Sequence, residues 1–267
     1  MTKTTSVLIE CDRLDPRPAD EAADRPLPDC VNIPLEELSG RMYELPPRDV
    51  VVRVVGPARL AEQAVAVLAR HQRPAKIAAA DEPVDPRPGL RRLWGPNALL
   101  AELAPKLPVS DAIDLACGCG RDAVFLAALG WQVTAIDILP DALQRGRELA
   151  ARYAPAAPPV RWIEHDLEGE LPPVRPAGLV SVFRFLDRRL YRRLHRLVRP
   201  GGTVLVETFT TLHRERHGRP ARERFVLRPG ELPGLLEGLE ILDYSEAWRG
   251  RAHTARARAV RPRCREQ

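Results

Sequence analysis

The sequence predicts an α/β protein in which a mostly parallel, doubly wound sheet follows a smaller α/β domain. Short apolar runs alternate with longer amphipathic stretches after residue 94, which is typical of strands that are each followed by a helix. A glycine-rich turn, "CGCG", directly follows the first of these runs. The chain has 267 residues, of which 45% are hydrophobic, so it can bury either one large core or one medium core and one small core.

The chain is expected to contain two domains joined by a linker. Residues 73–93 hold four prolines and show no sustained apolar period, which is typical of a linker or a domain boundary. We therefore predict a first domain at residues 1–80, a linker at residues 81–93 and a second domain at residues 94–267.

In the first domain, a unit of strand, loop and helix is expected. Residues 6–12 and 50–55 are apolar, β-branched runs of strand length. Between them, residues 30–45 predict an extended segment followed by a short helix. Residues 57–70, "PARLAEQAVAVLAR", carry apolar side chains at helical spacing and predict a helix directly after the second strand.

In the second domain, strands and helices are expected to alternate. The predicted strands are residues 111–117, 131–137, 160–167, 178–185 and 203–209, and the predicted helices are residues 99–107, 121–130, 140–154 and 187–198. In a sheet of this kind the ligand lies at the carboxyl ends of the strands, near the point where the strand order reverses.

The turn "DLACGCGRDA", residues 114–123, allows three interpretations. A metal or redox site is disfavoured, because Cys117 and Cys119 have no second ligand cluster near them at zinc-ligand spacing. A purely structural turn explains the cysteines as small packed residues. A nucleotide-binding loop explains more, because Gly118 and Gly120 follow a strand and open a helix, where backbone amides can approach a ligand.

Acidic residues at the next two strand ends favour the nucleotide-binding interpretation. Asp137 closes the strand after the turn, where a carboxylate can accept hydrogen bonds from both ribose hydroxyls. Asp166 ends the third strand beside the amide of Leu167, a pair suited to the edge of an adenine. The segment "LVRPGG", residues 197–202, then precedes the fifth strand.

Together, Asp114, "GCG", Asp137, Asp166 and "RPGG" resemble the class I S-adenosylmethionine-dependent methyltransferases over roughly residues 92–262. Within that superfamily, "DLACGCGRDAVFLAALGWQVTAID" is similar to the tellurite-resistance methyltransferase group. The resemblance implies a Rossmann-like sheet of strand order 3-2-1-4-5-7-6 with strand 7 antiparallel. The last two strands would then be residues 239–248 and 254–262.

The resemblance also implies which residues bind S-adenosyl-L-methionine. Asp114 would lie near the ammonium group of the cofactor, and Arg121 or Asp122 would help to fix its amino-acid end. The full expected set of cofactor-binding residues is Asp114, Ala116, Gly118, Gly120, Arg121, Asp137, Ile138, Asp166, Leu167 and Phe183.

The first domain resembles a rhodanese-like domain over roughly residues 5–75. "VNIPLEEL" and "DVVVRVV" match the family's corresponding segment and the strand before its active loop. The family's persulfide-carrying cysteine is missing, because Val54 and "VGPAR" stand at that position, and Cys30 lies elsewhere. We therefore expect a degenerate module without sulfurtransferase activity.

Methyl transfer from a sulfonium needs alignment more than a dedicated base, so no catalytic residue is assigned. On the acceptor side the candidates are Arg184, which can hold an anion, together with Phe185 and Glu207. His213 and His217 are four residues apart in a polar insertion, but they have no third ligand nearby. They are interpreted as exposed histidines, and no metal is expected.

The composition of the chain gives little support for a nucleic-acid or membrane partner. Of 41 basic residues only Lys3, Lys76 and Lys106 are lysines, so the net charge of +5 reflects arginine usage and is weak evidence for nucleic acid. No membrane segment or signal-like stretch is apparent, and the five scattered cysteines do not predict a disulfide framework. A cytoplasmic protein is expected.

The sequence thus predicts a methyltransferase that uses S-adenosyl-L-methionine and acts on a small-molecule acceptor. Two alternatives remain open at this stage. One is a non-catalytic sensor or scaffold that binds the cofactor. The other is an NAD-dependent oxidoreductase on the same fold, which the absence of the third glycine of G-x-G-x-x-G disfavours.

Overall fold

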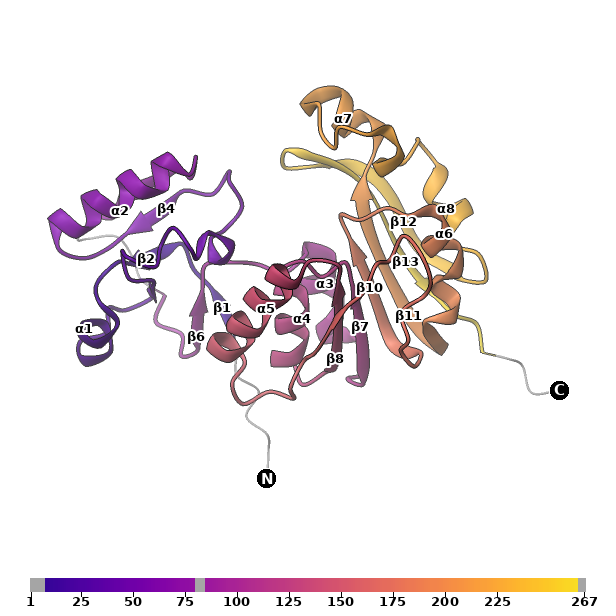
Figure 1. Ribbon diagram of the computed structural model, residues 1–267, viewed down its shortest axis with the longest axis horizontal. Coiled ribbons are helices and arrows are strands. Elements are labelled where there is room, and N and C mark those ends of the chain that lie inside the picture. Colours follow the sequence, from indigo (N-terminus) through magenta and orange to yellow (C-terminus); the bar gives the residue numbers. More distant parts are fainter. Residues whose placement is uncertain (1–7, 80–84, 264–267) are drawn as a thin grey trace. The chain divides into compact units, whose positions relative to one another are not determined.

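The computed structural model describes residues 8–79 and 85–263 and divides into two compact units, Met1–Gly95 and Pro96–Gln267 (Figure 1). Part of the expected linker is ordered structure, because Leu90–Arg92 form a strand of the first unit. Residues 81–84 of that linker and Cys264 lie outside the described residues.

The first unit contains a four-stranded parallel sheet and a separate two-stranded pair. The sheet has the order β3-β2-β4-β5, and the pair joins β1 to β6 in parallel. The strands are β1 (Leu8–Glu10), β2 (Arg13–Asp15), β3 (Val31–Asn32), β4 (Val52–Val54), β5 (Ala75–Ile77) and β6 (Leu90–Arg92), and the helices are α1 (Ala19–Asp24), the 3-10 turn η1 (Met42–Glu44) and α2 (Ala58–Arg70).

One strand of the first unit, β2, was not predicted. The apolar run at residues 6–12 supplies only β1, whereas the sheet itself is built on β2, whose sequence is "RLD". Arg13 and Asp15 are buried there, and Asp15 forms an ion pair of 2.7 Å with Arg17. Charged residues in a buried strand remove the apolar pattern by which strands are recognised.

Helix α2 covers this sheet in the way its spacing predicts. Ala61, Ala64 and Leu68 are fully buried on one side of the helix. They join a core that includes Leu14 of β2 and Val54 of β4. The strand, loop and helix unit of residues 50–70 is therefore present.

The second unit is built on a seven-stranded sheet of order β12-β13-β11-β10-β7-β8-β9. Its strands are β7 (Asp111–Leu115), β8 (Gln132–Asp137), β9 (Arg161–Glu164), β10 (Ala177–Phe183), β11 (Val198–Phe209), β12 (Glu240–Arg249) and β13 (Ala252–Val260). Strand β13 is antiparallel to both of its neighbours, and the other pairs are parallel. Numbered in chain order from β7, the sheet reads 3-2-1-4-5-7-6 from its β9 edge.

Helices pack along this sheet. They are α3 (Ala98–Leu103), α4 (Arg121–Ala128), α5 (Pro140–Tyr153), α6 (Arg188–Arg193), α7 (Thr211–His217) and α8 (Glu231–Leu235), with the 3-10 turns η2 (Ala104–Lys106), η3 (Leu194–Arg196) and η4 (Glu223–Phe225). Helices α4 and α5 contact each other and β8, whereas α6 and α8 add Leu190 and Leu232 to a core shared with β10, β11 and β13. None of the helices in the described residues is long and apolar enough to cross a bilayer.

Two boundaries differ from the predicted ones. The helix expected at residues 187–198 ends as the 3-10 turn η3, and "RPGG" belongs to the start of β11, where Gly201 has a φ of 79°. The third strand ends at Glu164, so Asp166 lies beyond it.

Candidate functional site

The loop after β7 has a left-handed backbone at three positions. Ala116, Gly118 and Gly120 have φ values of 54°, 54° and 73°. A Cβ atom on Gly120 would lie 2.4 Å from the ring of Trp162, so only glycine fits there. A Cβ atom on Gly118 would meet nothing within 4 Å, so the space above this residue is open. The loop therefore presents bare backbone to a ligand.

Asp137, the last residue of β8, fixes the shape of this loop. Its Oδ2 atom accepts a hydrogen bond of 2.7 Å from the amide of Gly118, and its Oδ1 atom accepts one of 3.0 Å from the amide of Leu139. The next two side chains, Ile138 and Leu139, are 53% and 59% exposed, which is unusual for large apolar residues. A carboxylate and an apolar surface thus lie together at the end of β8.

Asp114 and Asp122 form a pair of acidic side chains below the loop. Asp114 is buried and accepts a hydrogen bond of 3.0 Å from the hydroxyl of Ser181, while its other oxygen, Oδ2, has no hydrogen-bond partner among the described residues. Burial, and then the negative charge of Asp122, raise the pKa of Asp114 well above its ordinary value.

Asp122 lies in the first turn of α4 and is held by the chain that precedes α3. Its Oδ1 atom accepts a hydrogen bond of 2.6 Å from the amide of Asn97. Burial raises the pKa of Asp122 to about 6, although the charges of Arg121 and Arg184 oppose this shift. Two carboxyl groups with raised pKa values form a site that favours a cationic partner.

Asp166 lies next to Asp137 through the pairing of β8 and β9. The amide of His165 donates to the carbonyl of Asp137 at 3.0 Å, which brings the turn after β9 to the same edge of the sheet. The Asp166 carboxylate is exposed and accepts a hydrogen bond of 2.9 Å from the amide of Glu168. The side chain of Leu167 is buried in the core beneath it.

Strand β10 ends at Phe183, which is buried, and Arg184 follows with a φ of 56°. The amide of Arg184 donates to the carbonyl of Glu207 at 2.8 Å, which pins this left-handed residue beside β11. Its side chain is exposed, and its guanidinium has no hydrogen-bond or ion-pair partner in the described part of the chain. The guanidinium of Arg184 therefore places a positive charge at the carboxyl ends of the strands, between β10 and β11.

The other two acceptor-side candidates are engaged in structural contacts. Glu207 is buried and accepts hydrogen bonds from Thr254 Oγ1 at 2.7 Å and from Asn97 Nδ2 at 3.2 Å, and it pairs with Arg256 at 3.2 Å. Phe185 packs against the core of the second unit. The structure thus brings Arg184 to the edge of the sheet and uses Glu207 to join β11, β13 and the start of α3.

Several residues of this site are absent from the sequence-based set. Asn97 carries a signal that was available, since asparagine is a preferred N-cap and its side chain accepts the amide of Leu99 at 2.9 Å. Trp162 and Ser181 have no such signal in the sequence. Trp162 lies against Gly120 and Ser181 donates to Asp114, and only the folded sheet brings these residues together.

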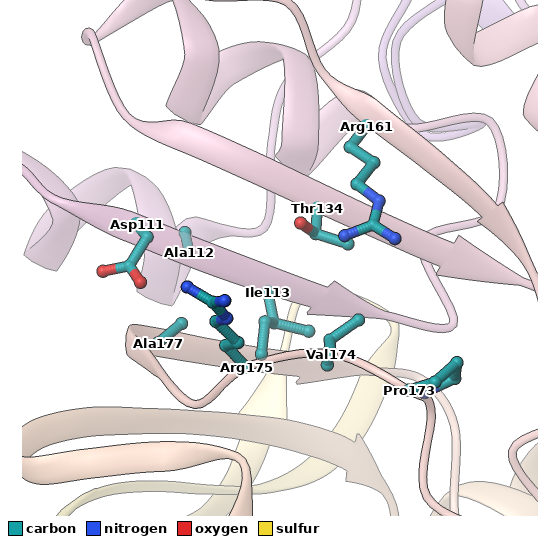
Figure 2. Close-up of a pocket in the computed structure, with 9 residues that line it drawn as sticks. All are labelled: Asp111, Ala112, Ile113, Thr134, Arg161, Pro173, Val174, Arg175 and Ala177. Carbon is teal, nitrogen blue, oxygen red and sulfur yellow. The ribbon is translucent and has the colours of Figure 1, made fainter.

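A hollow of the second unit lies at the opposite strand ends (Figure 2). Its volume is about 500 Å³, and it is lined by Asp111, Ala112, Ile113, Thr134, Arg161, Pro173, Val174, Arg175 and Ala177. Asp111, Arg161 and Ala177 begin their strands, whereas Gly118 and Asp137 lie where strands end. The connection over residues 165–176 contains no helix, and its prolines at 172, 173 and 176 explain why. This hollow is therefore separate from the glycine loop.

Cysteine chemistry at the loop is disfavoured. The thiol of Cys117 is largely buried, and its pKa is raised by burial and then by the charges of Asp114 and Asp137, so it stays protonated. The described cysteines, Cys11, Cys30, Cys117 and Cys119, are unpaired. Within residues 8–79 and 85–263, no group of three or more histidine, cysteine, aspartate or glutamate side chains is arranged to hold a metal ion.

Comparison with known proteins shows which domain family part of the second unit is similar to. Residues 112–202 match the family model described as "Methyltransferase domain". A search of the curated proteins finds no match.

Among solved structures, one from work on the conversion of a disulfide bond into a thioacetal group during echinomycin biosynthesis is 21% identical, with a TM-score of 0.52. The matched region covers 62% of this chain and 82% of that protein's chain. The N-methyltransferase NodS from Bradyrhizobium japonicum, in complex with S-adenosyl-L-homocysteine, is 19% identical with a TM-score of 0.50, over 61% and 84% of the two chains. TehB from Haemophilus influenzae is 17% identical with a TM-score of 0.50, over 62% of each chain.

These structural likenesses are to the fold, and the match over residues 112–202 is to the domain family. Residues 112–202 of the second unit are therefore similar to a methyltransferase domain, and the unit shares the α/β fold of these solved structures.

Proposed function

We propose that this protein is an S-adenosyl-L-methionine-dependent methyltransferase that acts on a small-molecule acceptor. The observation that carries the proposal is the glycine loop, held by Asp137 with open space above Gly118 and with the Asp114–Asp122 pair beside it. When bound, S-adenosylmethionine supplies a methyl group on a positively charged sulfur, which is an activated leaving group.

The residues present fit the two polar ends of such a cofactor. The unpartnered Oδ2 of Asp114, together with Asp122, would bind its ammonium group, since a cation nearby stabilises both ionised carboxylates. Asp137 would bind the ribose hydroxyls. Each of its oxygens accepts one described backbone hydrogen bond and keeps acceptor capacity for a second.

The adenine ring would lie over the exposed side chain of Ile138, with the turn at Asp166 and Leu167 at its edge. Phe183 and Arg184 end the neighbouring strand, so the acceptor would approach from that side. In this arrangement the chain's contribution to rate is alignment of donor and acceptor, which contributes roughly 7 to 11 kcal/mol in well-oriented reactions.

We also propose that the first unit is a rhodanese-like module that has lost sulfur transfer. Val54 is the last residue of β4, and the chain enters α2 four residues later without a cysteine. The remaining thiols are poor sulfur carriers, because burial raises the pKa of Cys11 to about 12 and also raises that of Cys30.

The test is calorimetry with S-adenosylhomocysteine, followed by transfer of labelled methyl groups from S-adenosylmethionine into the small-molecule fraction of a cell extract. Saturable binding together with a labelled small product supports the proposal. Binding without any labelled product would favour a sensor or scaffold. Binding of NAD in place of S-adenosylhomocysteine would overturn the cofactor assignment.

A further inference from the structure

A group of ring side chains lies where β11 ends. Phe209 stacks on His213 with a centroid separation of 4.2 Å and an interplanar angle of 17°, and His213 lies 4.7 Å from His217. Trp248 continues the series at 6.2 Å from His217 and 5.1 Å from His253. We call these five residues the ring cluster. They come from β11, α7 and the β12–β13 hairpin, which lie together in Figure 1.

The ring cluster lies next to Arg184 and therefore near the glycine loop. Phe209 follows Glu207 by two positions, so both side chains project from the same face of β11. The amide of Arg184 is bonded to the carbonyl of Glu207, and the charge of Arg184 acts on both Asp122 and His213. Arg184 thus lies between the start of α4 and the ring cluster.

The neighbours of His213 fix which ring nitrogen carries its proton. The amide of His253 donates to Nδ1 of His213 at 3.4 Å, so the neutral ring carries its hydrogen on Nε2. The cationic or ionisable groups that face this ring are Arg184, directly after β10, His217 from α7 and His253 from β13. Burial, and then electrostatic interactions with His217, Arg184 and His253, lower the pKa of His213 below its ordinary value, which favours the neutral imidazole near pH 7.

We propose that Arg184 and His213 together bind an anionic methyl acceptor, with the guanidinium and the Nε2–H group as its two donors and with Phe209 and Trp248 of the ring cluster as its apolar wall. This inference rests on the proposed methyltransferase function. The acceptor class is a small carboxylate, thiolate or oxyanion, because both donors lack acceptor capacity on the side they offer.

This acceptor class needs no general base. The bond between the methyl carbon and the sulfonium sulfur breaks with its electron pair passing to sulfur, and a lone pair of the anion forms the new bond to carbon. No proton leaves the acceptor. Glu207, two positions before Phe209 on β11, is already engaged by Thr254, Asn97 and Arg256, so it is not available as a free carboxylate base.

Positive charge at the rim of the ring cluster supports an anion over a cationic or neutral acceptor. The guanidinium of Arg216 lies 4.6 Å from the centre of the Trp248 ring, and Trp248 is 41% exposed. An anion with an apolar part would therefore meet cations from two directions and a ring surface between them.

The test uses benzoate as the probe and the protein loaded with S-adenosylhomocysteine. Imidazole ¹H–¹⁵N spectra are expected to give His213 as the neutral Nε2–H form at pH 7 and to show saturable shifts of its signals on addition of benzoate. Arg184→Gln and His213→Phe are each expected to weaken benzoate binding by about tenfold, the loss of one charged or buried donor. The phenylalanine keeps an aromatic ring to stack on Phe209, and it removes the Nε2–H group together with the Nδ1 acceptor of the His253 amide.

Two controls separate this inference from its alternatives. Arg196→Gln changes an exposed arginine at the end of η3 and should leave benzoate affinity unchanged; an equal loss there would reveal unspecific binding and overturn the proposal. A protonated His213 at pH 7, or an Nδ1–H form, would overturn it as well. S-adenosylhomocysteine affinity should stay within about twofold in both site variants. Failure of that binding in the unaltered protein would instead reject the proposed function.

Discussion

The carboxylate of Asp137 accepts a hydrogen bond of 2.7 Å from the amide of Gly118, so the end of one strand holds the loop that follows the neighbouring strand. The same side chain also binds the amide of Leu139 at the start of α5. One acidic residue therefore sets the loop and presents the polar group on which the cofactor assignment depends.

Replacing Asp137 by alanine is expected to lower the affinity for S-adenosylhomocysteine by at least about tenfold, because the ribose contacts and the loop support are lost together. Isothermal titration calorimetry measures the change. Asp243→Ala, which removes an exposed carboxylate on β12, is the matched control and should bind as the unaltered chain does. Equal affinities for all three proteins would contradict the site assignment.

Binding of S-adenosylhomocysteine is expected to weaken as the pH falls through about 6, the pKa to which burial raises Asp122. A bound ammonium favours the ionised carboxylate, so protons compete with the ligand below that pH, by up to about tenfold per pH unit for one proton. Calorimetry between pH 5 and 8 in the unaltered chain and in Asp122→Asn tests this. The asparagine variant should lose most of the dependence, and a slope preserved in it would refute the role of Asp122.

In the ligand-free protein, the raised pKa of Asp122 has the opposite pH dependence: it favours the folded state at low pH, whereas ligand binding is favoured at high pH. The pKa of Asp122 is higher in the folded protein than in an unfolded chain, so its contribution is fully present at low pH and is lost as the pH rises through about 6. The thermal midpoint of the ligand-free second unit should fall less between pH 5 and 7 in Asp122→Asn than in the unaltered protein. Identical slopes in a scanning calorimeter would show that this carboxyl group is not buried as described.

Gly120→Ala is expected to destabilise the second unit by roughly 2 to 4 kcal/mol, since the new methyl group would overlap Trp162 and the backbone has a positive φ. Gly118→Ala is the matched comparison, with the same type of backbone conformation but no neighbour within 4 Å, and should cost about 1 kcal/mol. Denaturant unfolding followed by tryptophan fluorescence measures both. A larger loss for Gly118→Ala than for Gly120→Ala would argue against the packing of Trp162.

Glu207→Gln is expected to lower the stability of the second unit by about 1 to 3 kcal/mol, because Arg256 loses its buried counter-charge. Affinity for S-adenosylhomocysteine should change little, since the contacts of Glu207 are with Asn97, Thr254 and Arg256. Glu240→Gln, an exposed position on β12, provides the control for unfolding. Loss of cofactor binding with unchanged stability would instead assign Glu207 to the cofactor site.

Local patterns in the sequence were enough to predict the glycine loop and most of the strands and helices of the second unit. A strand, two glycines and a helix start are adjacent in the chain, so the left-handed turn at Gly118 and Gly120 can be predicted from them directly. The contacts of Glu207 cannot, because its partners Asn97 and Thr254 are 110 and 47 residues away. Strand β2 could not be predicted for another reason. Its buried residues Arg13 and Asp15 are charged, so the strand lacks the apolar pattern by which strands are recognised.

The ring of Trp162 lies against two glycines at once, Gly120 of the loop and Gly146 of α5, where added Cβ atoms would lie 2.4 and 2.5 Å from it. A single indole therefore acts as a shared spacer between two segments that would otherwise move separately. Because that spacer is in place without a ligand, little conformational entropy remains to be lost if the loop binds the proposed cofactor. Replacing either glycine by a larger residue would displace the indole. The loop would then have to become ordered each time a ligand binds.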